Sequence, residues 1–219
     1  MGYFGSKATT GLCQVLLGLF PPHDVYIESH LGGGALMKRK APAMRSIGID
    51  RDRRALDGFG CGYPVELIHG CAHAFLATFP FQGTELVYSD PPYLRATRRS
   101  DRRYRHDYTD ADHVALLELL KGLPCQVMVS GHPSALYQTM LSDWRRVALQ
   151  VTTQARVRTE VVWLNFEPGR MHWAGHAGRN ATDRQRIKRK AARWAQGYRK
   201  MPPDERLAVV SAIMAIEAG

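Results

Sequence analysis

The sequence predicts a doubly wound α/β domain, with a mostly parallel seven-stranded sheet, an antiparallel terminal hairpin and C-terminal helices. Two observations carry this prediction. Short apolar stretches alternate with helix-forming stretches as far as residue 141. The last two apolar stretches, 145–152 and 158–166, are joined by too few residues for a crossover helix, so they must pair antiparallel. With 219 residues, 45% of them hydrophobic, the chain can build one sizeable core.

The elements can be placed in order along the chain. Ser6 is expected to cap a helix that ends near Leu19, before two prolines. The strands expected before the hairpin are 24–28, 46–50, 65–68, 85–88 and 126–130. The helices expected between them are 35–40, 72–79, 110–121 and 134–141. The hairpin then places a reversed strand at the sheet edge. Trp144 and Trp163 are expected in the core, and His106 and His113 on the surface.

The composition changes after Pro168. A Gly- and His-rich stretch is followed by a helix at 182–199, charged on nearly all sides, and by an amphipathic helix at 204–218. The sequence therefore predicts an α/β domain at 1–167 and a basic helical extension at 168–219.

The net charge of +10 is unevenly distributed. Residues 95–105 hold six arginines against one acid, and residues 179–200 hold nine basic residues against one acid, so the rest of the chain is net acidic. Two basic patches on an acidic body favour a nucleic-acid partner, although a solvated face with a basic tail would read the same way. The residues expected to contact nucleic acid are Arg95, Arg98, Arg99, Arg102, Arg103, Arg105, Arg184, Arg186, Lys188, Arg189, Lys190 and Arg193.

Several classes of protein are disfavoured by what the chain lacks. No apolar run is long enough for a membrane helix, and the first residues do not have the layout of a signal peptide, so we expect a cytoplasmic protein. The four cysteines form no CxxC pair and the nine histidines no HExxH pattern. We therefore expect neither a metal site nor a disulfide framework.

Acidic and glycine residues follow the first two strands. Glu28 precedes the turn Gly32-Gly33-Gly34, and Asp50 follows the second strand, 22 positions after Glu28. Glycines let the backbone approach a ligand closely, and an acid in the position of Asp50 commonly accepts hydrogen bonds from ribose hydroxyls. An acid before the glycines suits a cationic group, such as an amino-acid amine or a sulfonium. A plain strand-to-helix connection is the alternative interpretation of the glycine turn.

The tetrapeptide Asp90-Pro91-Pro92-Tyr93 follows the fourth strand. The prolines stiffen the backbone, so a carboxylate and a fixed carbonyl can together accept from an amino group with two N–H donors. Tyr93 can stack on the base that carries this amine. The alternative, a surface turn made rigid by proline, fits poorly with the strand and the glycine turn upstream.

Four segments together carry a family resemblance: Tyr3-Phe4-Gly5-Ser6-Lys7, residues 28–34, Asp90 to Tyr93, and residues 158–166. In this order they resemble the Dam-type (D12 class) adenine-specific DNA methyltransferases, over most of residues 1–167. The resemblance implies a Rossmann-like class I methyltransferase fold. It also implies S-adenosylmethionine as cofactor, S-adenosylhomocysteine as product, no metal, and double-stranded DNA as substrate, with the target adenine flipped out of the duplex.

The resemblance also implies roles for individual residues. Cofactor contacts are expected from Tyr3, Phe4, Gly5, Lys7, Glu28, Gly32, Gly33, Gly34, Asp50 and Asp90, and catalytic roles from Asp90, Pro91, Pro92 and Tyr93. Glu28 and the glycines would hold the methionine part and Asp50 the ribose. Asp90 and Pro91 would accept hydrogen bonds from adenine N6, while Tyr93 would stack on the flipped base.

The chain departs from the family pattern in two places. Residues 69–73 offer no acid for the cofactor adenine, and residues 72–84 leave no room for the target-recognition domain that the family inserts there. The open alternatives are N4-cytosine methylation, N6-adenine methylation of RNA, and a basic nucleic-acid-binding module without turnover. A compact solitary enzyme suggests a bacterial or phage origin, with or without a partner restriction enzyme.

Overall fold

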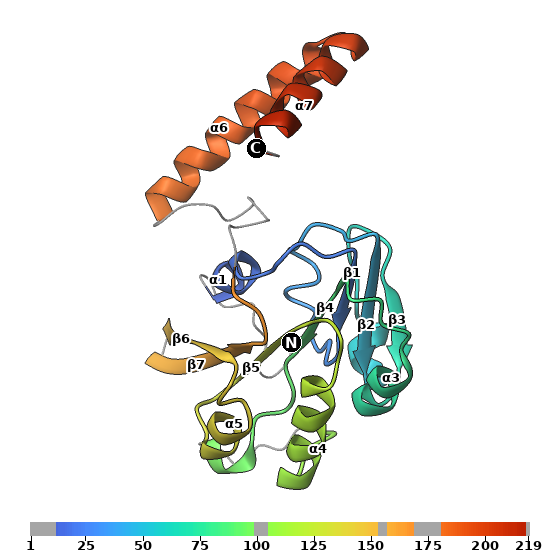
Figure 1. The fold of residues 1–219 in the computed structure, drawn as a ribbon, viewed down its shortest axis with the longest axis vertical. Helices are drawn as coiled ribbons and strands as arrows, with labels where there is room; N and C mark the ends of the chain where they lie inside the picture. The colour runs from blue at the N-terminus through green and yellow to red at the C-terminus, as the bar shows by residue number, and fades with distance from the viewer. Residues whose placement is uncertain (1–11, 99–104, 153–156, 169–180, 218–219) are drawn as a thin grey trace. The chain divides into compact units, whose positions relative to one another are not determined.

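The computed structural model describes residues 12–98, 105–152, 157–168 and 181–217. By their contacts, the residues divide into two compact units, Met1–Ala174 and Gly175–Gly219. The first unit holds the sheet and the second holds two long helices (Figure 1). The boundary expected from the sequence lies seven residues earlier, between 167 and 168, and the two expected domains and their roles stay predictions.

The described strands form one seven-stranded sheet in the order β3-β2-β1-β4-β5-β7-β6. The strands are β1 (Val25–Glu28), β2 (Arg45–Asp50), β3 (Glu66–His69), β4 (Glu85–Ser89), β5 (Gln126–Gly131), β6 (Arg145–Thr152) and β7 (Val157–Leu164). Neighbouring strands pair in parallel from β3 to β5, whereas β7 runs antiparallel to both β5 and β6. This arrangement confirms the doubly wound, mostly parallel sheet with a terminal antiparallel hairpin, and with it the Rossmann-like class I methyltransferase fold.

One detail of the expected topology is wrong. The reversed strand, β7, lies inside the sheet, and β6 forms the edge. The reason is that β7 is apolar on both faces, because Val161, Val162, Trp163 and Leu164 are all almost fully buried. A strand without a polar face needs neighbours on both sides, whereas β6 exposes Arg145 and can lie at the edge.

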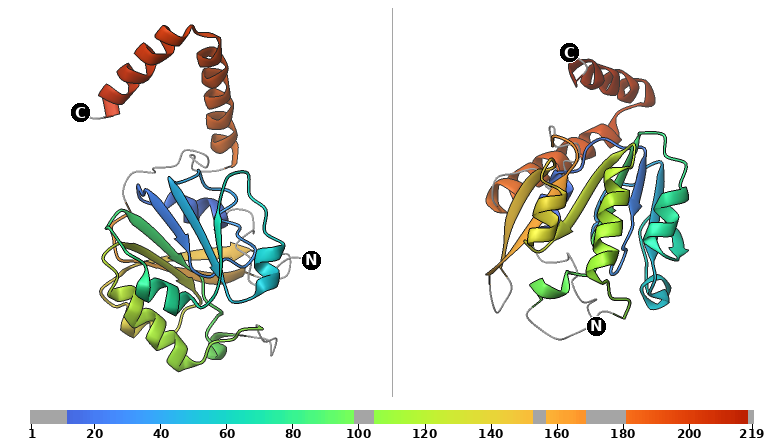
Figure 2. Two further views of the ribbon diagram at one scale, coloured as in Figure 1. Left: turned by 90° about the vertical axis from the view of Figure 1, so that its right-hand side faces the viewer. Right: turned by 60° about the horizontal axis from the view of Figure 1, so that its bottom comes forward.

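Helices cover both faces of the sheet (Figures 1 and 2). The helices of this unit are α1 (Leu12–Gly18), α2 (Arg53–Asp57), α3 (Ala72–Thr78), α4 (Asp110–Lys121) and α5 (Ala135–Met140), with the short 3₁₀ helix η1 (Arg95–Thr97). Tyr26 and Leu86 face α1, whereas Ile27 and Val87, the next residues of β1 and β4, face α3, α4 and α5. This alternation of side chains between the two faces makes two apolar cores, one on each side of the sheet.

The helix expected at 35–40 does not form, and this segment is a series of turns. Its backbone is used differently: the Met37 N–H donates to the carboxyl Oε2 of Glu28 at 3.1 Å, and Pro42 follows closely. The Lys38 and Lys40 N–H groups donate to carbonyls four residues back, but the Arg39 N–H donates to the Leu36 carbonyl, three residues back, so no regular helix continues. The elements α2 and η1 were not expected, because neither is long enough to show a periodic pattern.

His113 is fully buried, so its expected place on the surface is wrong. It lies on the apolar face of α4 with Leu116, Leu117 and Leu120, a spacing of three and four residues that the sequence contains. Its Nδ1 lies 2.9 Å from the hydroxyl of Tyr137. His106 is exposed, and Trp144 and Trp163 are buried, as expected.

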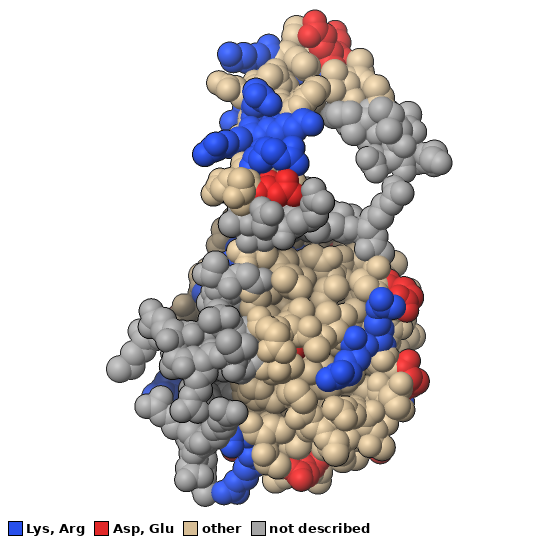
Figure 3. Space-filling model, turned by 90° about the vertical axis from the view of Figure 1, so that its left-hand side faces the viewer, with Lys and Arg blue, Asp and Glu red and all other residues tan. Residues whose placement is uncertain are grey.

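The second unit consists of α6 (Ala181–Lys200) and α7 (Pro203–Glu217). Both helices occur where the sequence predicts them, separated at Met201-Pro202. The Lys and Arg side chains of α6 form a dense basic surface (Figure 3), and Trp194 among them is 64% exposed. Within the described residues, no helix combines the length and the apolar character needed to span a bilayer.

The burial of His113 makes the stability of the fold depend on pH. Burial lowers the pKa of His113 to about 4, from an ordinary value of 6.5. Between these values the unfolded chain binds a proton that the folded chain does not, so His113 costs stability as the pH falls from 6.5 to 4. At about 1.4 kcal/mol per pKa unit, the loss from this group is about 3 kcal/mol.

Urea unfolding of the wild type and of His113→Gln at several pH values tests this. Glutamine can still bond Tyr137 but does not titrate, so the variant should lose less stability than the wild type between pH 6.5 and 4. If the free energy of unfolding falls equally with pH in both proteins, His113 does not cause the loss of stability.

Candidate active site

The pocket lies where the strand connections diverge. Because β1 pairs in parallel with both β2 and β4, the connections from their carboxyl ends separate and leave a crevice there. A pocket of about 850 Å³, partly open to solvent, occupies this position.

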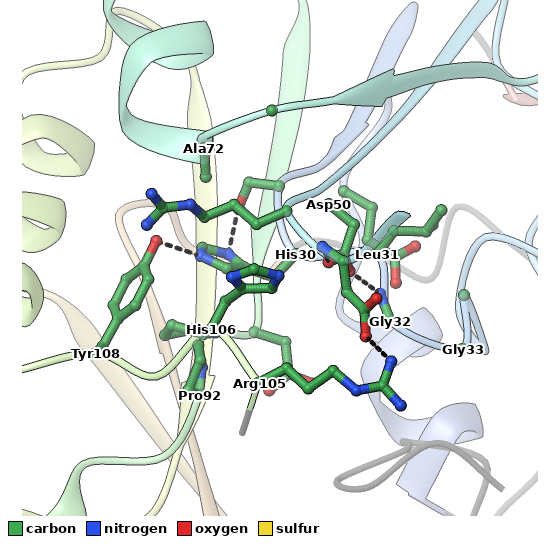
Figure 4. Close-up of a pocket in the computed structure, with 18 of the residues that line it drawn as sticks. His30, Leu31, Gly32, Gly33, Asp50, Ala72, Pro92, Arg105, His106 and Tyr108 are labelled. Carbon is green, nitrogen blue, oxygen red and sulfur yellow. Dashed lines mark hydrogen bonds and ion pairs between the residues drawn. The ribbon is translucent and has the colours of Figure 1, made fainter. Parts of the chain in front are cut away.

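The glycine turn and Asp50 form one wall. The Gly32 N–H donates to Asp50 Oδ2 at 2.7 Å, and the Asp52 N–H donates to Oδ1 at 2.8 Å (Figure 4). Gly32 and Gly34 have φ values of 49° and 60°, which other residues rarely adopt. The two backbone donors therefore hold the carboxylate of Asp50 at the pocket edge, each oxygen keeping a further lone pair for a ligand.

Glu28 is buried at the base of the pocket, with an exposed fraction of 3%. Its Oε2 accepts from the Tyr26 hydroxyl at 3.2 Å and from the Met37 N–H at 3.1 Å. The pKa of Glu28 is raised to about 8, mainly by burial and in part by the charge of Asp90. A cation bound beside Glu28 would favour its ionised form.

The tetrapeptide after β4 forms the opposite wall. Asp90 accepts a hydrogen bond at 2.8 Å from the hydroxyl of Ser130 on β5. Tyr93 is only 6% exposed, and its hydroxyl donates to Glu160 Oε2 at 3.2 Å. Its ring centroid lies 4.0 Å from that of His132. Side chains from β5, β7 and the loop after β5 therefore determine how this wall is held.

A segment at 105–108 forms a third side of the pocket. Arg105 Nη1 lies 2.9 Å from Asp52 Oδ2, and both residues line the pocket. The Tyr108 hydroxyl lies 3.0 Å from His30 Nε2 (Figure 4). It also lies 3.3 Å from His73 Nδ1. Burial lowers the pKa of His30 to about 3 and raises the pKa of Tyr108, so these two groups are uncharged at neutral pH.

Most of the expected site residues in the first unit meet in this pocket. The lining includes Glu28, Gly32, Gly33, Gly34, Asp50, Asp90, Pro91, Pro92, Tyr93 and Arg105. It also includes residues the sequence analysis missed, namely His30, Arg51, Asp52, Ala72, His106 and Tyr108. The sequence signal for His30 and Asp52 was position, because each lies two residues from an expected ligand.

The other expected site residues lie elsewhere. Arg95 is exposed on η1, whereas Arg98 has a side chain only 8% exposed that pairs with Asp107 and donates to the Tyr93 carbonyl. Arg186, Lys188, Arg189, Lys190 and Arg193 are exposed on α6. Outside the described residues lie Tyr3, Phe4, Gly5, Lys7, Arg99, Arg102 and Arg103, as does the side chain of Arg184.

The described side chains define the chemistry available. They include no group of three or more His, Cys, Asp or Glu placed to hold a metal ion. Among the described residues, the pocket lining contains no cysteine or lysine, and its acidic groups are Glu28, Asp50, Asp52 and Asp90. Such a site can bind a cation and hold an amine, so it suits a transfer in which the donor molecule carries an already activated group.

No protein-family model matches the chain, and no curated protein sequence matches it. Solved structures that are similar include an rRNA methylase from Streptococcus thermophilus (12% identity, 69% of this chain and 92% of that chain covered, TM-score 0.44). They also include magnesium protoporphyrin IX methyltransferase (ChlM) from Synechocystis PCC 6803 with bound SAM (13% identity, 70% and 74% covered, TM-score 0.43).

TrmK of M. capricolum, in complex with the natural cofactor product S-adenosyl-homocysteine, matches over 96% of this chain and 97% of that chain, at 9% identity and a TM-score of 0.49. The fold assignment made above rests on the strand order of this chain and not on these likenesses.

The glycine turn yields a stability prediction. At Gly34 the φ of 60° is unfavourable for other residues, and an added Cβ would clash with the ring of Phe59. We expect Gly34→Ala to lower the free energy of unfolding by about 2–4 kcal/mol, strain and overpacking combined. At Gly60 an added Cβ would meet nothing within 4 Å, so Gly60→Ala is the matched control. Equal effects of the two substitutions in urea unfolding would contradict this reading of the turn.

Proposed function

We propose that the protein is an S-adenosylmethionine-dependent methyltransferase that methylates the N6 amine of a flipped adenine in double-stranded DNA. One observation carries the proposal: Glu28, the glycine turn, Asp50 and Asp90 to Tyr93 surround a single pocket. Two of the four segments that resemble the Dam-type enzymes, 28–34 and Asp90 to Tyr93, thus meet here from distant parts of the chain.

The pocket residues fit the cofactor by their chemistry. Glu28 is a buried carboxyl with a raised pKa, and a cation beside it would favour its ionised form. The methionine end of the cofactor carries such a positive charge. Asp50 is held by two backbone N–H groups with acceptor capacity left for ribose hydroxyls. The positive φ at Gly32 and Gly34 lets the turn pass close to the ligand between these acids.

The catalytic wall would act by orientation. The cofactor supplies an already activated methyl group, so the protein need not form a covalent intermediate. The Asp90 carboxylate and the Pro91 carbonyl would accept the two N–H bonds of the amine and turn its lone pair towards the methyl group. The charge that develops on the amine nitrogen in the transition state would be stabilised by Asp90. Tyr93 would face the base.

Binding of the nucleic acid would come from exposed basic residues. Five of the residues expected to contact nucleic acid are exposed on α6, and Arg95 is exposed on η1. Those on α6 are Arg186, Lys188, Arg189, Lys190 and Arg193. Phosphate contacts of this kind position a duplex without reading its sequence. A base must leave the helix stack to reach a pocket walled on three sides, so base flipping belongs to the proposal.

Mass spectrometry of nucleosides tests the reaction. The protein is incubated with S-adenosylmethionine and unmethylated duplex DNA, which is then digested, with total RNA as a second substrate. We expect N6-methyladenine in DNA, and a loss of at least about 100-fold in Asp90→Ala, because the variant lacks the charged acceptor.

The other outcomes separate the alternatives. N4-methylcytosine would keep the mechanism and change the base, and a product in RNA alone would change the substrate. If the protein neither binds the cofactor nor forms a methylated product, the result would support the binding module without turnover and would overturn the proposal.

Cofactor affinity should depend on pH through Glu28. With a pKa of about 8, Glu28 is mostly protonated in the free protein at neutral pH, and a cationic ligand must displace that proton. Affinity for S-adenosylmethionine should therefore fall by about tenfold per pH unit below 8 and level off above it. Calorimetric titration between pH 6 and 9 measures this.

The control for this experiment is Glu28→Gln, which keeps the size of the side chain and cannot ionise. We expect weaker binding and little pH dependence in the variant. Burial also lowers the pKa of nearby Lys40 to about 8, so Lys40→Met is measured beside it. A slope that persists in Glu28→Gln and vanishes in Lys40→Met would assign the proton to the lysine instead.

A further inference from the structure

Two buried hydroxyl groups lie beneath the catalytic wall. Ser130 on β5 and Tyr88 on β4 are 0% and 1% exposed, in strands whose other buried residues are mainly apolar. Buried hydroxyls are costly unless hydrogen-bonded, so polar residues at these positions call for a partner. Their partners lead directly to the proposed catalytic acid.

The hydrogen bonds form a chain with one direction. The Ser130 hydroxyl donates to Asp90 Oδ1 at 2.8 Å, and the oxygen of the same hydroxyl lies 2.7 Å from the Tyr88 hydroxyl. Because a serine hydroxyl has a single proton, its bond with Tyr88 must run the other way. Tyr88 therefore donates to Ser130, and Ser130 donates to Asp90.

The sheet makes this chain rigid. Strands β4 and β5 are adjacent and parallel, with Tyr88 opposite Met128 in the register. The Tyr88 ring packs in the core beside Phe20, with ring centroids 6.3 Å apart. A hydroxyl that turned away would break a hydrogen bond in the buried interior, so the chain holds one oxygen of Asp90 in a fixed direction.

We propose that Ser130, oriented by Tyr88, is a positioning residue that fixes the carboxylate of Asp90 for the amine. The expected effect on catalysis rests on the proposed function, whereas the orientation of Asp90 by Ser130 does not. A donor to the carboxylate stabilises the ionised form, so loss of the donor should raise the pKa of Asp90. It should also let the carboxylate rotate away from the amine.

The first test does not depend on activity. The pKa of the Asp90 carboxyl is measured by NMR in protein labelled with ¹³C-aspartate, with Asp90→Asn to assign the signal. We expect a rise of about one unit in Ser130→Ala relative to the wild type, and a smaller rise in Tyr88→Phe. The same pKa in all three proteins would overturn the inference.

The second test uses kinetics of the full chain. Ser130→Ala should lower kcat by about 10- to 100-fold, because a hydrogen bond to a charged group is lost, with little change in cofactor affinity. The acid limb of the kcat/KM pH profile should move up, and Ser130→Thr, which keeps the hydroxyl, should recover most of the rate. The matched control is Ser46→Ala, a buried serine on β2 that does not line the pocket.

The two tests separate the inference from the proposed function. A raised pKa of Asp90 in Ser130→Ala, in a protein that methylates neither DNA nor RNA, would support the positioning contact and reject the function. Methylation by the wild type with identical kinetics in Ser130→Ala and Ser46→Ala would keep the function and reject the positioning role.

Discussion

The parallel pairing of β1 with β4 is the constraint on which the site depends. In this register Glu28 lies opposite Tyr88, so the turn after β1 and the tetrapeptide after β4 leave the sheet side by side. Some sixty residues of chain separate them, and only the sheet brings them together. The pairing of β1 with β2 adds Asp50 from the other side. Three acidic residues thus meet at one edge because of strand order, with no direct attraction between them.

Carboxylates gathered in this way repel one another, and each of the three is stabilised by different hydrogen-bond donors. Asp50 is stabilised by two backbone N–H groups, and Asp90 accepts from Ser130. Glu28 has only partial compensation, and its raised pKa shows that the free protein leaves this group protonated at neutral pH. A cationic ligand would supply the positive charge that favours the ionised form of Glu28. The pocket is therefore electrostatically incomplete at the point where the proposed cofactor would carry its positive charge.

Sequence reasoning succeeds where a pattern is repeated and fails where contacts are individual. All seven strands and the helix α4 follow from periodicity and caps that are visible in the chain. The expected helix at 35–40 is instead a series of turns, and its Met37 N–H donates to Glu28, a contact that no local pattern predicts. In the same way, Tyr108 joins the pocket through His30, a partner 78 positions away. The acids and glycines of the site were recognisable because their residue types are unusual at the ends of strands.

The two basic stretches, similar in composition, differ in what the structure does with them. In the first, Arg98 pairs with Asp107 and Arg105 with Asp52, so both guanidinium groups hold the walls of the pocket. In the second, the basic residues of α6 are exposed, with the large exposed ring of Trp194 among them. An arginine bound to an internal carboxylate has less of its charge to offer a phosphate. In the proposed function, the exposed residues of α6 are therefore candidates for phosphate contacts, whereas Arg98 and Arg105 also bind carboxylates beside the pocket. Charge counted along a sequence does not separate these two uses, because the partners of Arg98 and Arg105 appear only in the folded chain.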